Sequence, residues 1–290
     1  MNRVSRCLLG ASLVAAFASI AAAQGTPPPP KVLVISREFT KPGKAGAAHD
    51  KTESLFIQAF ARAKWPTHYL GMTSLSGKQR AIFLISYDTF EAWEKDNLAT
   101  AKNAALAAGL EHAGVVDGEL LESMDQGVFT FREDMSLRTM SDISHMRYLD
   151  ISVYHVRPGH GGEWQELVKL VKAAYDSGVP SAHWAMYELR FGGEGGTYIV
   201  LTARKSLAEL DQSPAIDKQF AAAMGEAGMK RFGELVTSAV SSSDHELFSF
   251  NPNMSYVEES WIKADPDFWK PKPSAAPAAK SATEQKKATP

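Results

Sequence analysis

The 290-residue sequence contains one cysteine, Cys7, in its first ten residues. The segment that holds Cys7 has the features of a leader that is removed on export, so we expect the mature chain to contain no cysteine. Disulfide bonds, thiolate catalysis and zinc sites built on cysteine are therefore excluded for the mature protein.

The sequence also lacks an excess of positive charge. It has 31 Lys and Arg against 33 Asp and Glu, for a formal net charge of −2. No basic stripe or patch marks a nucleic-acid surface, and we predict no nucleic-acid partner.

No apolar run is long enough to span a bilayer, which takes about 20 residues. The longest runs from Leu8 to Ile20, follows Arg3 and Arg6, and ends at three alanines before Gln24. This pattern predicts a signal peptide at residues 1–23, with an uncleaved anchor as the alternative. We expect an exported protein, periplasmic or extracellular, without a membrane partner after cleavage.

Both ends of the mature chain lack the residues that build a core. Residues 24–30 include four consecutive prolines, which predict a stiff spacer. Residues 271–290 are rich in Ala, Pro, Lys and Ser and contain no large apolar side chain, so they cannot offset their ordering entropy by burial. They are predicted to be a disordered tail, with a partner-binding tail as the alternative.

One stretch of the sequence occurs twice. FTFREDMSL at 129–137 returns 119 residues later as FSFNPNMSY at 248–256. The Pro-Gly breaks at 42–43 and 158–159 correspond in the same way, at an offset of 116. Such agreement predicts two tandem repeats, at 31–137 and 147–257.

Each repeat reads as strand, helix, strand, strand, helix, strand, which is the ferredoxin-like order. In the first repeat we expect the second helix within 98–124 and the last strand at 126–133. Such a sheet has helices on one face only, so its other face needs a cover. The predicted fold is α+β, with two ferredoxin-like βαββαβ repeats packed sheet to sheet as an intramolecular barrel.

Two sets of residues resemble the dimeric α+β barrel superfamily, which includes the NIPSNAP-like and antibiotic-biosynthesis-monooxygenase-like families. The first set is Phe39-x-x-Pro42-Gly43, where the first strand ends, together with its counterpart at 156–159. The second set is the strand-to-helix segment at 82–93, together with its counterpart at 198–207. The resemblance implies a barrel that two chains usually build, here formed as a pseudo-dimer within one chain. The sequence assigns no higher oligomer.

Strand alternation divides the first strand of each repeat into two faces. Apolar residues fill one face, which we assign to the helices: Leu33, Ile35 and Phe39, then Leu149, Ile151 and Val153. The other face is predicted to line a ligand pocket inside the barrel, with Glu38, Asp150 and Tyr154 as candidates. The alternative is that these polar groups only pair with one another.

A histidine followed by an aromatic residue occurs at the same point of both repeats. The pairs are His68-Tyr69 and His183-Trp184, and they predict two imidazoles related by the pseudo-twofold axis. The alternative is that each ring caps the turn after the preceding proline. His49, by contrast, is predicted to lie off the apolar stripe of the first helix.

These observations predict a protein that binds a small organic molecule inside its barrel. They favour binding over catalysis without deciding between them, and no cofactor is expected. One alternative, implied by the resemblance, is a cofactor-independent or haem-linked monooxygenase that uses His68, His183, Tyr154 and Glu38. A second alternative is a structural barrel with a filled interior.

Overall fold

The computed structural model describes residues 28–139 and 142–270. The predicted signal peptide, most of the spacer and the tail lie outside these ranges. In the first half the elements are β1 (Val32–Thr40), α1 (Ala47–Ala63), β2 (Tyr69–Ser74), β3 (Arg80–Tyr87), α2 (Phe90–Lys102), α3 (Ala104–Gly118) and β4 (Leu121–Phe131). In the second half they are β5 (Tyr148–Val156), α4 (Gly161–Gly178), β6 (Ala185–Phe191), β7 (Thr197–Arg204), α5 (Ser213–Ala239) and β8 (Val240–Phe250), followed by α6 (Glu259–Ala264) and α7 (Pro266–Trp269).

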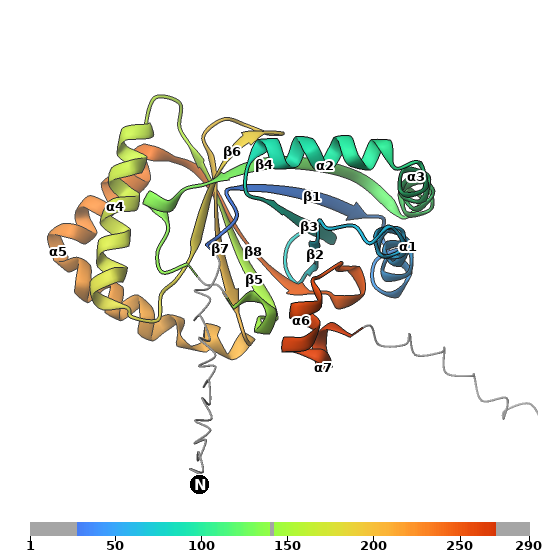
Figure 1. Cartoon of the computed structure of the whole chain (residues 1–290). Coiled ribbons are helices and arrows are strands. Elements are labelled where there is room, and N and C mark those ends of the chain that lie inside the picture. The colour runs from blue at the N-terminus through green and yellow to red at the C-terminus, as the bar shows by residue number, and fades with distance from the viewer. Residues whose placement is uncertain (1–27, 140–141, 271–290) are drawn as a thin grey trace, which may run out of the picture.

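The eight strands form one closed antiparallel barrel in the order β1-β3-β2-β8-β5-β7-β6-β4. Helices α1, α2 and α3 lie outside one side of it, and α4 and α5 outside the other (Figure 1). Within the described residues, no helix is long and apolar enough to cross a bilayer. The predicted α+β class and barrel are confirmed, and one chain closes the barrel by itself.

Two ladders join the halves, and we call them the seams. In one, β2 pairs with β8, and in the other β4 pairs with β6. Each half therefore pairs both of its outer strands with the other half, which closes the barrel.

The repeated sequence stretch lies at the seams, where it makes the same contacts twice. After β4 and β8 the chain enters a short 3₁₀ turn, at Glu133–Met135 and Pro252–Met254, whose methionine is buried. The next serine then binds a backbone N–H of the facing strand. Met186 N donates to Ser136 Oγ and Gly71 N donates to Ser255 Oγ, both at 2.9 Å.

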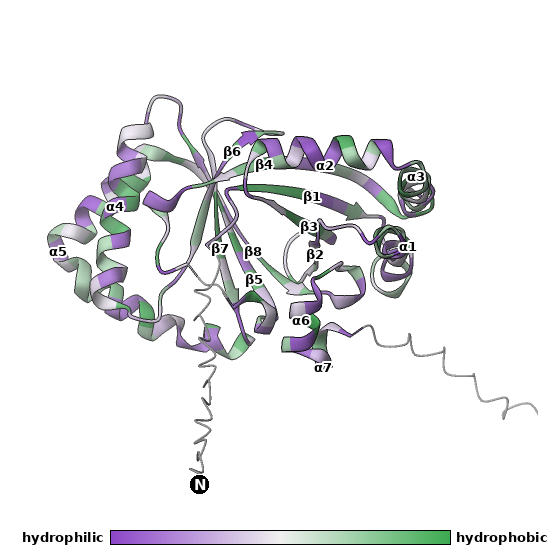
Figure 2. Ribbon diagram, in the orientation of Figure 1, coloured by the Kyte–Doolittle hydropathy of each residue, from purple (hydrophilic) through white to green (hydrophobic). Residues whose placement is uncertain are grey.

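At one end of the barrel, an apolar core fills the interior. Leu33, Met72, Leu149 and Phe248 pack there, each at most 5% exposed. Trp269 of α7 packs against the same cluster and donates from Nε1 to Ser144 O at 2.7 Å. In Figure 2 the strands carry apolar stretches interrupted by polar residues, and the helices alternate polar and apolar residues. The aromatic residues after the second repeat thus close this end of the barrel.

Candidate functional site

The opposite end of the barrel contains a cavity of about 420 Å³. Its floor is apolar and its rim carries charges of both signs. The floor consists of Ile35, Ile82, Phe129, Ile151, Leu189, Ile199 and Phe248, and the rim includes Arg37, Lys78, Arg80, His155, Glu194, Asp244 and Glu246. A filled, purely structural barrel predicts no interior cavity, so the cavity counts against that alternative.

The predicted assignment of strand faces was wrong. The apolar face of β1 and β5 points into the barrel, where Ile35 and Ile151 line the cavity. The polar face points outward, and Glu38 and Tyr154 lie beneath helices. The physical reason is that the interior of an eight-stranded barrel is just wide enough for side chains to fill, which favours apolar residues there.

Arg80 is the most deeply buried charge of the cavity, at 7% exposed. Its guanidinium pairs with Glu246 and lies between two rings, 5.4 Å from the centroid of Phe39 and 5.2 Å from that of Phe248. A planar, ion-paired guanidinium that stacks on aromatic faces gives the cavity a rigid wall.

His155 lines the same cavity, and its hydrogen bonds define its tautomer. Thr197 Oγ1 donates its one hydrogen to Glu194 O at 2.7 Å and lies 3.1 Å from His155 Nδ1. With that hydrogen on Glu194 O, the hydroxyl accepts from His155 Nδ1, and the ring proton is then on Nδ1. In the neutral ring, Nε2 is then the acceptor, and it makes no hydrogen bond within the described part of the chain.

The two paired imidazoles predicted from the sequence do not line the cavity. His68 stacks on Tyr256 with the ring centroids 4.7 Å apart. His183 has both ring nitrogens 3.0 Å from backbone oxygens, those of Ser181 and Ala203. The turn-capping alternative describes His183 well.

The remaining candidates occupy three separate places. Asp150 pairs with Arg204 at 3.0 Å, and Trp184 donates from Nε1 to Met135 O at 2.9 Å. Tyr69 is packed among aromatic rings, and its buried hydroxyl has no hydrogen-bond partner among residues 28–139 and 142–270. Whether any of these residues binds a ligand stays a prediction.

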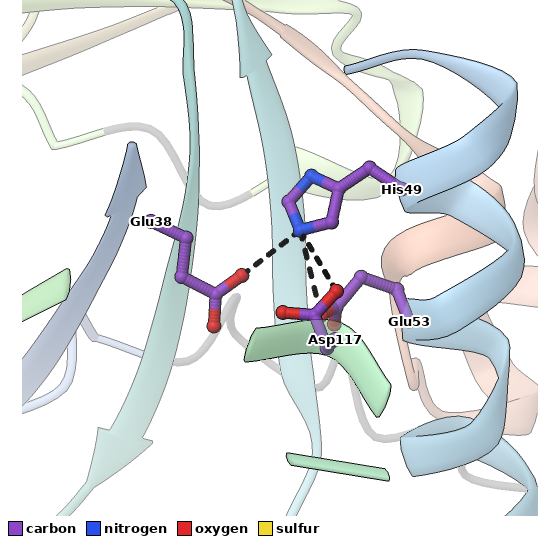
Figure 3. A group of neighbouring side chains, drawn as sticks. All are labelled: Glu38, His49, Glu53 and Asp117. Atoms are coloured by element: carbon purple, nitrogen blue, oxygen red, sulfur yellow. Dashed lines mark hydrogen bonds and ion pairs between the residues drawn. The ribbon is translucent and has the colours of Figure 1, made fainter. Parts of the chain in front are cut away.

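A second cluster of functional groups lies between β1 and the helices, away from the cavity. Glu38, His49, Glu53 and Asp117 are all buried, and one ligand atom from each lies within 4.8 Å of the others. Three carboxylates converge on one nitrogen, His49 Nε2, which lies 3.1 Å from Glu38, 3.3 Å from Asp117 and 3.7 Å from Glu53 (Figure 3).

Local geometry explains how the sequence assembles this cluster. His49 and Glu53 are four residues apart on α1 and therefore share one face of that helix. Asp117 comes from the last turn of α3, which packs closely on α1 at Gly109. A Cβ at Gly109 would lie 3.0 Å from the Cβ of Ala59, so a side chain there would push the helices apart.

The low polarity around the cluster perturbs its pKa values. Burial raises the pKa of Glu53 to about 9, assisted by the charges of Glu38 and Asp117. Burial also raises the pKa of Glu38. For His49, burial lowers the pKa, but hydrogen bonds to Asp117 and Glu38 outweigh this effect and raise it to about 10. At neutral pH the cluster therefore retains protons unless another cation replaces them.

Sequence reasoning missed three of these four residues. His49 was expected off the apolar stripe of its helix, yet it is 2% exposed. A signal was present, since a histidine and a glutamate four apart on a helix follow a strand that carries Glu38. Nothing in the local sequence pointed to Asp117, which lies in α3, far from His49 and Glu53 in the sequence.

Comparisons with known proteins find similar structures only. No family model matches the chain, and no curated protein is significantly similar to it. A "putative monooxygenase" from Fusobacterium nucleatum has a TM-score of 0.49 at 11% identity, over 77% of this chain and 93% of that one. An anthrone oxidase-like protein has a TM-score of 0.48 at 13% identity, over 79% of this chain and 94% of that one. A "putative chlorite dismutase" has a TM-score of 0.45 at 10% identity, over 78% of this chain and 96% of that one. At such identities, similarity says nothing about activity.

Proposed function

We propose that this protein binds a small, mainly apolar organic molecule bearing a hydroxyl group, at the open end of its barrel. The cavity of about 420 Å³, with its apolar floor and charged rim, carries the proposal. Ligand sites are commonly apolar hollows with a few well-placed polar groups. The free acceptor Nε2 of His155 suits a hydroxyl donor on the ligand.

A binding assay with 2-naphthol tests this proposal, because 2-naphthol is fluorescent, apolar and carries one hydroxyl. We expect it to bind and to raise the melting temperature, since a ligand that binds only the folded state stabilises it. Naphthalene, which lacks the hydroxyl, should bind more weakly, and His155→Phe should remove the difference.

A cavity-filling variant locates the binding. Val153→Phe places a ring in the cavity and should weaken 2-naphthol binding at least tenfold. Val115→Phe is the matched control, because Val115 is 67% exposed on α3. Equal binding by both variants, or no melting-temperature shift with 2-naphthol or a wider metabolite panel, would contradict the proposal.

An enzymatic role is the second candidate, and His155 favours it. A neutral imidazole with its Nδ1 proton held by Thr197 can accept a proton from a bound hydroxyl at Nε2. Turnover of such a ligand by the wild type, lost in His155→Phe, would support catalysis. Intact ligand after prolonged incubation in air would leave binding as the function.

The haem alternative rests on residues that the structure places elsewhere. An axial histidine must present a ring nitrogen to the cavity. His68 and His183 do not line the cavity, whereas His155 does. A Soret band on adding haem, lost in His155→Ala, would support this alternative, and the absence of a band would remove it.

We also infer that the two halves arose by tandem duplication of a ferredoxin-like unit of the NIPSNAP-like or monooxygenase-like kind. Both seams make the same serine contact to a facing backbone N–H, which supports this inference. A homologue that consists of one half and closes the barrel as a homodimer is the expected finding. Homologues whose halves follow different strand orders would argue against it.

Export remains a proposal drawn from residues 1–23. We expect mature protein isolated from its host to begin at Gln24, which intact-mass measurement can check. A mass that includes Met1 would contradict export by cleavage.

A further inference from the structure

Four side chains between β1, α1 and α3 place one ligand atom each within 4.8 Å of the others, the spacing expected around a metal ion. Donor atoms about 2.1 Å from a tetrahedral ion lie about 3.4 Å from one another. The three distances from His49 Nε2 to the carboxylates are 3.1, 3.3 and 3.7 Å. The imidazole nitrogen has one hydrogen at most, so it cannot donate to all three oxygens at once.

Two polar atoms beside this shell have no protein partner within the described residues. Glu53 is 3% exposed, and its carboxyl hydrogen-bonds with that of Glu38, but its Oε1, directed at His49, has no hydrogen-bond partner. The buried Tyr69 hydroxyl is also unpaired, and the charges of Glu53 and Glu38 add to the burial that raises its pKa. Buried polar atoms are nearly always paired, so both atoms indicate a missing partner at this place.

The fold does not require charge at this position. In the second half, the corresponding place between β5, α4 and α5 is filled by Tyr154, Trp164, Leu167, Val168 and Leu235, which form one apolar cluster. Exchanging buried charges for packed apolar residues is often neutral or stabilising. Burying three carboxylates therefore lowers the folding stability of the first half, whereas the second half has apolar residues at this place.

The carboxylate of Asp117 is held in place by a neighbouring hydroxyl. Thr52 Oγ1 lies 2.5 Å from Asp117 Oδ1 and 2.9 Å from His49 O. Groups of this kind orient the ligands of metal ions and are part of a metal site. All four ligand residues are buried, and a closed shell of protein ligands is typical of a structural metal ion rather than a catalytic one.

We propose that Glu38, His49, Glu53 and Asp117 bind one divalent transition-metal ion, which ties α1 and α3 to β1. One imidazole with three carboxylates suits Zn²⁺ or Mn²⁺, whereas Mg²⁺ prefers oxygen ligands and retains water. Because the shell is closed, the ion enters while the chain folds.

The first experiment uses the wild-type chain without an affinity tag. The protein is unfolded in urea with chelator, then refolded with ZnCl₂, MnCl₂ or MgCl₂ and freed of loose ions. We expect one Zn²⁺ or Mn²⁺ per chain by elemental analysis, a melting temperature several degrees higher than without metal, and no such rise with Mg²⁺. No retained metal, or equal effects of all three ions, would overturn the proposal.

A pair of matched variants tests the residues. Glu53→Gln keeps the shape and removes one anionic ligand, and it should weaken metal binding at least tenfold. Glu163→Gln is the control, because Glu163 lies in the first turn of α4 beside His160, at a half-buried position far from the cluster in sequence. Unchanged binding by Glu53→Gln, or equal loss in both variants, would contradict the assignment.

A spectroscopic measurement on the wild type does not depend on any variant folding. X-ray absorption at the zinc edge should show one imidazole nitrogen among oxygen ligands. A shell without imidazole, or with two or more, would place the ion elsewhere in the protein.

Discussion

Arg37 and Glu38 are neighbours on β1, and they serve opposite faces of the sheet. Arg37 lines the cavity, whereas Glu38 contacts His49 beneath α1. One strand thus takes part in both candidate sites, because successive side chains point to opposite sides. A register slip of one residue would exchange them and abolish both.

The buried cluster should make the metal-free protein sensitive to alkali. Glu53 and His49 have pKa values of about 9 and about 10 in the fold, above the reference values of 4.5 and 6.5. Each group binds its proton more tightly in the folded state than in the unfolded state. Its contribution to the free energy of unfolding is therefore complete below the reference pKa and is lost as pH rises through the folded pKa. We expect the free energy of unfolding to fall between pH 7 and pH 10, measured with urea and chelator.

A double variant provides the control for this pH dependence. Replacing His49 by Trp and Glu53 by Val, the residues at positions 164 and 168 of the corresponding helix α4, removes these two titrating groups. Its stability should change less over the same range. A wild type whose stability is constant or rises from pH 7 to pH 10 would contradict the role given to the cluster.

At this scale the sequence named some of these residues but placed them on the wrong face of the sheet. Glu38 and Tyr69 were named as candidates, and both lie at or beside the cluster, although on the outer face of the barrel. Alternation shows which residues share a face, but it does not show which face meets the core. The interior of a closed barrel is decided by packing that no single strand reveals.

At the scale of elements, the seams explain why a short motif is repeated. Gly71 donates its N–H to Ser255, and a Cβ on Gly71 would lie 2.3 Å from Met254 O. The turn after β8 therefore packs directly on β2, and the turn after β4 meets β6 through Ser136 in the same way.

Removing the seam serine should destabilise the barrel. Ser255→Ala leaves the buried N–H of Gly71 without its partner, and we expect a loss of about 1–3 kcal/mol in the free energy of unfolding. Urea denaturation measures it. Ser243→Ala, at an exposed position of β8, is the control and should cost little. Equal stability of the two variants would show that the contact is unimportant.

Element order was predictable from the sequence, whereas some boundaries were not. The predicted helical stretch at 98–124 is divided by Asn103, whose side chain caps α3 by accepting from Leu106 N. Strand β4 begins at Leu121 instead of 126, because its first residues pair with the end of β1. The exposed residues Glu122–Gln126 carry no apolar alternation that would have marked them as a strand.

At the scale of the whole molecule, the barrel is apolar and closed at one end and open at the other. Trp269, 2% exposed, packs on Phe250 and on the other aromatic rings of α6 and α7. Arg147 pairs with Asp265 and stacks on Phe268, which fixes these two helices to the start of β5. The cavity is therefore reached from the end opposite to α7.

Deleting the Trp269 side chain should weaken the whole barrel. We expect Trp269→Ala to lower the free energy of unfolding by about 3–5 kcal/mol, the usual cost of removing a buried aromatic ring. Phe191→Ala is the control, because Phe191 is 63% exposed. A small, equal effect of both changes would show that α7 is only loosely attached.

The two seams also set the order in which the chain can be completed. β2 must wait for β8, the last strand to be synthesised, and β4 must wait for β6. Until then the first half exposes its apolar inner face, a hazard for any newly made protein. At high concentration, two incompletely folded chains can therefore exchange halves. The product is a domain-swapped dimer with two barrels, each built from one half of each chain.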